Sequence, residues 1–124
     1  MQKRFSVTGA FFGALAVTLG AFGAHGLRDV VSENALRIFH TGVEYQFYHS
    51  LALLMTGLMV SKKPSSLATA AGNLFTLGIV LFSGSLYCLA LMPSIPLIGV
   101  VTPIGGLCFI GGWLLLGYAA WKTD

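Results

Sequence analysis

Long apolar stretches without a charged residue limit most strongly what this chain can fold into. Residues 5–24, 67–92 and 95–121 contain no Asp, Glu, Lys or Arg, and residues 41–60 form a fourth apolar stretch that includes Glu44 and His49. About 20 apolar residues in a helix cross the ~30 Å hydrocarbon core of a bilayer. Lipid offers the backbone no hydrogen-bond partner, so each stretch is expected to be helical. The sequence therefore predicts an all-α integral membrane protein, a bundle of four transmembrane helices.

The composition indicates the same class of protein. Charged residues make up 9% of the 124 residues, and the mean hydropathy is +0.83. Soluble domains carry about 25% charged residues, because their surfaces face water. No polar linker divides the chain, so residues 1–124 are expected to form a single transmembrane domain. The basic residues stand in short clusters and do not follow a polar face, which argues against nucleic acid as a partner.

Basic residues beside the apolar stretches predict the orientation in the membrane. Lys3 and Arg4 precede the first stretch, Lys62 and Lys63 separate the second from the third, and Lys122 follows the fourth. Lys and Arg accumulate in the cytoplasmic flanks of membrane helices. Both termini are therefore expected on the cytoplasmic side.

The connections between the stretches also carry local signals. Ser32 is a suitable N-cap, and apolar residues follow it at helical spacing. Residues 32–41 are therefore predicted to form a short amphipathic helix at the outer interface that continues into the second span. Residues 92–96 contain two prolines and predict a tight outer turn. Pro103 predicts a kink in the last helix.

Small residues predict how the helices pack. They recur every three or four positions in the first span, as Gly9, Gly13, Ala16, Gly20 and Ala24, and in the fourth, as Gly105, Cys108 and Gly112. Such stripes let helix backbones approach closely. A tight bundle is expected, either within one chain or between copies of a homo-oligomer. The two cysteines, Cys88 and Cys108, are expected to be buried free thiols, with a disulfide possible only if packing brings them together.

Most polar side chains of the spans are expected in the outer half of the bundle. The first and third helices end there and the second and fourth begin there, while the inner half is expected to be nearly bare of polar groups. The outer group is the candidate ligand-binding cluster, and its members are His25, His40, Glu44, Tyr48, His49, Ser83, Ser85, Tyr87 and Thr102. Serines in membrane helices commonly bond neighbouring helices, so a packing role is the alternative for Ser83 and Ser85.

Glu44 is the first candidate for a functional residue, because a carboxylate inside a membrane span is costly and usually has a partner or a role. One interpretation is structural, with Glu44 paired to Arg28, Arg37 or His40 where the helix enters the membrane. The other is a proton-coupled or ligand-binding role. Tyr48 follows at a spacing of four and lies on the same helix face.

The three histidines are chemically suited to bind a metal or a haem iron. Their spacing matches no metal-binding motif, and His49 lies on a different helix face from His40 and Glu44. A shared site would require His25 or residues of the third helix to complete it. The chain has no Ser-His-Asp order, P-loop or dinucleotide fingerprint, so nothing in the sequence indicates an enzyme.

Four segments resemble a known family in the same order along the chain. They are residues 19–27 (LGAFGAHGL), 41–51 (TGVEYQFYHSL), 81–89 (LFSGSLYCL) and 102–106 (TPIGG). Together they are similar to a family of small bacterial inner-membrane proteins, number 423 among the domains of unknown function, related to transmembrane protein 256 of eukaryotes. The resemblance implies a four-helix multi-pass protein of the bacterial cytoplasmic membrane. It implies no catalytic residue.

Three functions are compatible with these observations. The first is a non-enzymatic membrane factor that binds lipid or partner proteins. The second is a small proton-coupled transporter or channel that uses Glu44. The third is a metal-, haem- or quinone-binding membrane protein with a site built from His25, His40, Glu44 and His49. The cofactor, if there is one, stays open at this point.

Overall fold

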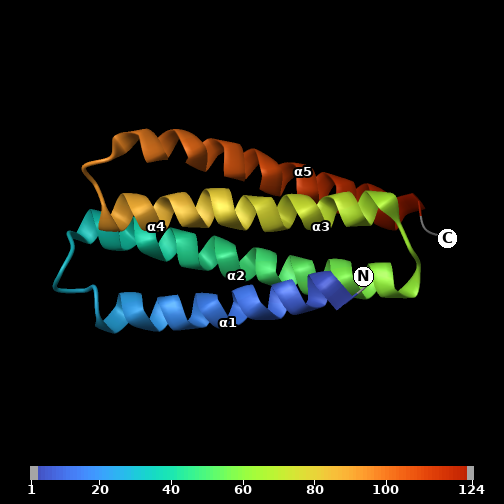
Figure 1. Ribbon diagram of the computed structural model, residues 1–124, viewed down its shortest axis with the longest axis horizontal. Coiled ribbons are helices and arrows are strands. Elements are labelled where there is room, and N and C mark those ends of the chain that lie inside the picture. The colour runs from blue at the N-terminus through green and yellow to red at the C-terminus, as the bar shows by residue number, and fades with distance from the viewer. Residues whose placement is uncertain (1–2, 123–124) are drawn as a thin grey trace.

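The computed structural model describes residues 3–122, which form helices and, within this range, no strand. In chain order the elements are α1 (Lys3–His25), α2 (Glu33–Lys62), α3 (Ser66–Gly78), the π-helical turn η1 (Ile79–Ser83), α4 (Gly84–Leu91), the 3-10 turn η2 (Pro96–Val100) and α5 (Val101–Lys122). α3, η1 and α4 follow one another without a break, so the described chain forms four long rods (Figure 1).

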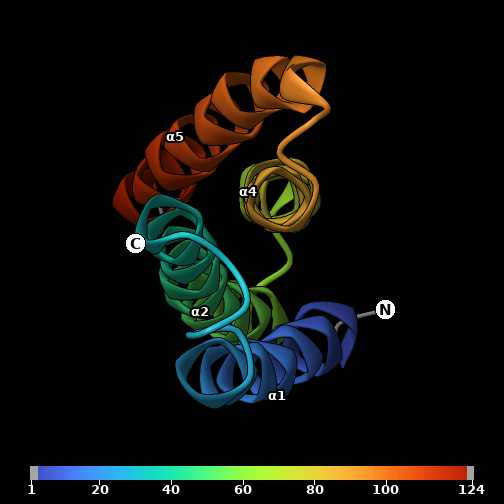
Figure 2. The same cartoon turned by 90° about the vertical axis from the view of Figure 1, so that its left-hand side faces the viewer.

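Consecutive rods run antiparallel and lie side by side (Figure 1). α1 packs mainly along α2, and α5 packs mainly along α3 and η1, while α2 also contacts α3 and α4. Seen end-on, α1 and α5 lie on opposite sides of the central pair (Figure 2). The rods therefore form an open row and not a closed ring (Figure 2). The start of α1 and the end of α5 lie at the same end of the rods (Figure 1).

Three helical stretches are long and apolar enough to cross a membrane, by length and composition: Lys3–His25, Ser66–Leu91 and Leu97–Lys122. They agree with the predicted spans 5–24, 67–92 and 95–121. The predicted span 41–60 lies within α2, which is not one of the three. α2 is less apolar because it lies between the other helices and buries polar side chains there, among them Gln46, His49 and Thr56.

The start of α2 confirms the predicted N-cap. The Ser32 hydroxyl accepts a hydrogen bond from the Ala35 N–H at 3.1 Å, and Glu33 stands in the first turn, where its charge favours the helix dipole. Residues 33–41 are the first turns of a single 30-residue helix that continues to Lys62. The predicted continuation into the second span is confirmed.

The third rod contains a π-helical turn that was not predicted. In η1 the backbone winds more widely, and the Gly84 N–H bonds back to the Ile79 carbonyl. At this turn the rod touches two neighbours at once, Gly105 of α5 through Phe82 and Gly42 of α2 through Ser83. The wider turn therefore lies where three helices meet.

The predicted kink at Pro103 is wrong. α5 begins at Val101, so Pro103 lies in its first turn and not in its interior. N–H groups of the first turn have no intrahelical partner, and a proline there removes no hydrogen bond. The chain before it, including Gly99, forms the 3-10 turn η2. The tight turn predicted at residues 92–96 is confirmed by the bond from the Ile95 N–H to the Met92 carbonyl.

The small-residue stripe of the first helix packs against α2 as predicted, with one exception. A Cβ on Gly9 would lie 2.8 Å from the Ser50 carbonyl oxygen, and a Cβ on Gly20 would lie 3.3 Å from the Val43 side chain. Ala16 is 1% exposed. Ala24 is exposed, and Gly23 takes its place beside the Phe39 ring. The stripe therefore lets α1 and α2 approach closely.

Candidate functional site

Gln46 connects three helices and was not among the predicted site residues. Its side chain is 2% exposed. The amide nitrogen donates to the Phe12 carbonyl of α1 at 2.9 Å, and the amide oxygen accepts from the Tyr87 hydroxyl of α4 at 2.6 Å. A carboxamide in the middle of an apolar helix was the signal in the sequence that could have identified it.

Ser83, Ser85 and Thr102 bond neighbouring helices. The Ser83 hydroxyl donates to the Gly42 carbonyl of α2 at 2.7 Å. Ser85 donates to the Phe82 carbonyl of its own rod at 2.8 Å, and the Ser85 and Thr102 hydroxyls join α4 to α5. These contacts support the packing role, since each hydroxyl has a protein partner.

His49 is held at both ring nitrogens. It is 3% exposed and stacks on Phe109 of α5, with ring centroids 3.5 Å apart and an interplanar angle of 8°. Its Nδ1 lies 2.7 Å from the Tyr45 carbonyl oxygen, which can only accept, so Nδ1 carries the proton. Nε2 then accepts from the Trp113 Nε1–H at 3.0 Å. The ring has no free lone pair for a metal or a haem iron.

Glu44 and Tyr48 form an exposed pair on α2. The Tyr48 hydroxyl donates to the Glu44 carboxylate at 3.2 Å, and both residues line a shallow groove of about 410 Å³ between α1 and α2. The other walls of this groove are apolar: Ala16, Val17, Gly20, Val43 and Phe47. Of the two interpretations of Glu44, the pairing with Arg28, Arg37 or His40 is not what the structure shows. Its partner is Tyr48, and Arg37 donates to the Asn34 side chain.

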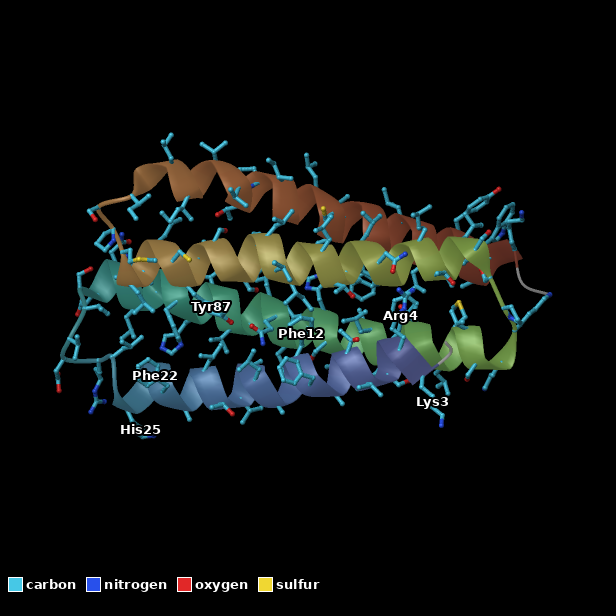
Figure 3. The ribbon with its side chains drawn as sticks, in the orientation of Figure 1. Lys3, Arg4, Phe12, Phe22, His25 and Tyr87 are labelled. Carbon is cyan, nitrogen blue, oxygen red and sulfur yellow. The ribbon has the colours of Figure 1, made fainter. Side chains whose placement is uncertain are left out.

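The two outer histidines lie apart from this pair. His25 is exposed at the end of α1 and points away from the helices (Figure 3). His40 is half-buried beside Gly23. Within residues 3–122, no group of three or more His, Cys, Asp or Glu side chains is placed to hold a metal ion. The structure therefore does not gather His25, His40, Glu44 and His49 into one site. Cys88 and Cys108 are half-buried free thiols.

The half of the bundle that holds the start of α1 and the end of α5, expected to be the inner half, is not bare of polar side chains. Thr8 of α1 and Asn73 and Thr76 of α3 line a hollow of about 270 Å³ between these helices, together with Arg4. Asn73 is exposed on the rod surface. The predicted outer cluster is thus divided into a buried network, the exposed Glu44–Tyr48 pair and two separate histidines. A further groove, mostly apolar but with polar side chains in its wall, lies at the other end.

Comparison with known proteins decides the family. The model of a protein family of unknown function, DUF423, matches residues 19–106. This chain belongs to that family.

Its relatives cover nearly the whole chain. The UPF0382 membrane protein YwdK of Bacillus subtilis is 45% identical over 98% of both chains. A UPF0382 membrane protein of Haemophilus influenzae is 38% identical over 99% of this chain and 98% of its own. The UPF0382 inner membrane protein YgdD of Escherichia coli is 41% identical over 94% of this chain and 88% of its own. No solved structure matches the chain. The family is accordingly one of membrane proteins.

Proposed function

We propose that this family member is a non-enzymatic protein of the bacterial cytoplasmic membrane that binds lipid or a partner protein at its intramembrane surface. One observation carries the proposal. Among residues 3–122, every buried polar side-chain atom has a hydrogen-bond partner within the chain. An interior binding site for a substrate would be expected to contain polar side chains that have no partner within the protein and can bind the substrate. The polar groups left for a ligand lie in surface grooves between helices.

All four rods span the membrane in this proposal. α2 is 30 residues long, or about 45 Å at 1.5 Å per residue, and it runs antiparallel between α1 and α3. If α1 and the third rod cross the bilayer in the same direction, α2 has to return the chain across it. Its polar side chains are tolerated because neighbouring helices cover them. The cations at the shared end of the rods support cytoplasmic termini.

Native mass spectrometry tests the proposal. Protein released from nanodiscs that contain a mixture of bacterial phospholipids is expected to retain specific lipid or protein masses. The same spectra report whether the chain is a monomer or a homo-oligomer. Release of the bare chain from every lipid mixture, with no co-purifying protein, would refute the proposal.

Proton-coupled transport is the second candidate function, and the exposure of Glu44 favours it. The carboxylate and Tyr48 face out of the molecule beside an apolar groove, where a second copy could complete a path. In liposomes, a proton-coupled flux that disappears in Glu44→Gln and persists in Glu33→Gln would establish this function. If the wild type and the two variants all show no proton-coupled flux, this function is excluded.

A further inference from the structure

A groove between α1 and α3 lies at the end of the molecule that carries the cations. It consists of two adjoining hollows of about 470 and 270 Å³ that share Arg4, Phe5 and Asn73. The first is also lined by residues 64–66 before and at the start of α3, and the second extends to Val80. From Ser66 to Val80 the rod rises about 21 Å at 1.5 Å per residue. The groove therefore extends from the membrane surface past the depth of one ~15 Å leaflet core.

The cations around this groove have no acidic counterpart in the part of the chain that the structure describes. Lys3, Lys62, Lys63 and Lys122 lie at the same end as Arg4. The sequence has four acidic residues, and three of them, Asp29, Glu33 and Glu44, lie toward the opposite end, while Asp124 is outside the described residues. This end of the molecule therefore attracts an anion.

Arg4 is the cation that the groove contains. Its guanidinium lies 4.4 Å from the centre of the Phe5 ring, and Phe5 packs against α3 at Gly72. Arg4 lies toward α3, whereas the neighbouring Lys3 points away from the helices (Figure 3). Cation–aromatic contact leaves the guanidinium donors free for a phosphate.

Asn73 lines both hollows, as Arg4 does, and it follows Gly72, against which Phe5 packs. It follows Ser66 by seven residues, or about 10 Å along the rod. The carboxamide is exposed, and no hydrogen bond joins it to another described residue. In a membrane such a group needs a partner from outside the chain. Beyond it, Leu77 and Val80 make the wall apolar.

This combination of a cation, a carboxamide and an apolar wall matches one kind of molecule. We propose that the groove binds a single anionic glycerophospholipid of the cytoplasmic leaflet. The headgroup phosphate lies at Arg4 and the start of α3, an ester carbonyl accepts from the Asn73 carboxamide, and an acyl chain follows Leu77 and Val80. Basic pockets between membrane helices on the cytoplasmic side are suited to such headgroups. The inference rests on the proposed function and names its ligand.

The test uses nanodiscs with equal amounts of phosphatidylglycerol and phosphatidylcholine that have the same acyl chains. Native mass spectrometry is expected to show one phosphatidylglycerol retained per chain in preference to phosphatidylcholine. Arg4→Gln should lower this preference about fivefold or more. Lys3→Gln, the matched loss of one charge on a side chain that points away, should leave it within about twofold. Asn73→Leu should lower retention of both lipids, because both carry the ester group.

Other results separate the possible failures. Equal retention of the two lipids by the wild type, or equal losses in Arg4→Gln and Lys3→Gln, would overturn the inference and leave the proposed function standing. Displacement of the bound mass by millimolar inorganic phosphate would overturn it in favour of a free-phosphate site. Retention of no lipid at all, with no bound protein, would overturn both. Thermal unfolding of each variant in the same lipid confirms that it is folded.

Discussion

Replacing Gly105 with alanine tests whether the closest helix crossing holds the bundle together. Gly105 is buried on α5 where it meets η1. A Cβ at this position would collide with the Phe82 backbone nitrogen and lie 2.8 Å from the Phe82 Cα and Cβ. These atoms belong to a helix backbone that cannot rotate away as a side chain can. α5 would have to move outward.

The size of the effect follows from the overlap. Ordinary contact begins at 3.4 Å, so the contacts with Cα and Cβ overlap by 0.6 Å, and the contact with the backbone nitrogen overlaps by more. If α5 moves outward to relieve this overlap, a gap of similar size opens along the rest of the interface. Such a gap removes about a quarter to a half of the dispersion attraction between the facing atoms. Overpacking of this kind costs about 1–3 kcal/mol. Alanine gains about 1 kcal/mol over glycine in helix propensity, so the propensity gain has to be measured separately.

The adjacent Gly106 supplies that measurement. A Cβ on Gly106 would lie 3.9 Å from the Phe82 ring, in ordinary contact. Gly106→Ala should therefore stabilise the protein or leave it unchanged, and Gly105→Ala should be about 2 kcal/mol less stable than Gly106→Ala. Reversible unfolding in detergent micelles, followed by far-UV circular dichroism, measures both. Variants that differ by less than about 0.5 kcal/mol would refute the close crossing at Gly105.

Three further predictions concern polar residues of α2. Gln46→Leu should lower the free energy of unfolding by about 1–2 kcal/mol, because the Tyr87 hydroxyl loses its partner. An unchanged free energy in the same assay would contradict the hydrogen bonds of Gln46 to Phe12 and Tyr87. A double-mutant cycle of His49→Phe and Trp113→Phe should give a coupling of about 0.6 kcal/mol, and at most about 1.7 kcal/mol, the mean and maximum for hydrogen bonds between membrane helices. No coupling would mean that the bond is not formed. Glu44→Gln should leave the unfolding midpoint unchanged, since Glu44 is exposed and glutamine still accepts from Tyr48; a large drop would reveal a structural role.

The helices themselves could be predicted from the sequence because their causes are local. The length of charge-free stretches decides which segments can be helical in lipid, and the Ser32 N-cap depends on a residue three positions away. The small residues Gly9, Gly13, Ala16 and Gly20 repeat at helical spacing, so their shared face follows from α-helix geometry. The structure confirms these expectations.

The partners of polar groups could not be predicted, because they depend on how separate helices meet. Gln46 bonds to residues 34 and 41 positions away in the sequence. His49 was recognised as lying on another face from Glu44, but its contact with Trp113 comes from a helix 64 positions on. The π-helical turn lies at the close contacts with Gly42 and Gly105, and its own apolar residues give no signal of it.

The open row of helices has a consequence for how the protein enters the membrane. α2 is synthesised second, yet its polar residues His49 and Gln46 are covered partly by α4 and α5, which follow later. In the proposed four-span arrangement, α2 therefore crosses the bilayer before its polar side chains have all their partners. The hairpin of α1 and α2 alone is an incomplete unit. In that four-span arrangement, stable insertion is complete only after α5 has entered the membrane.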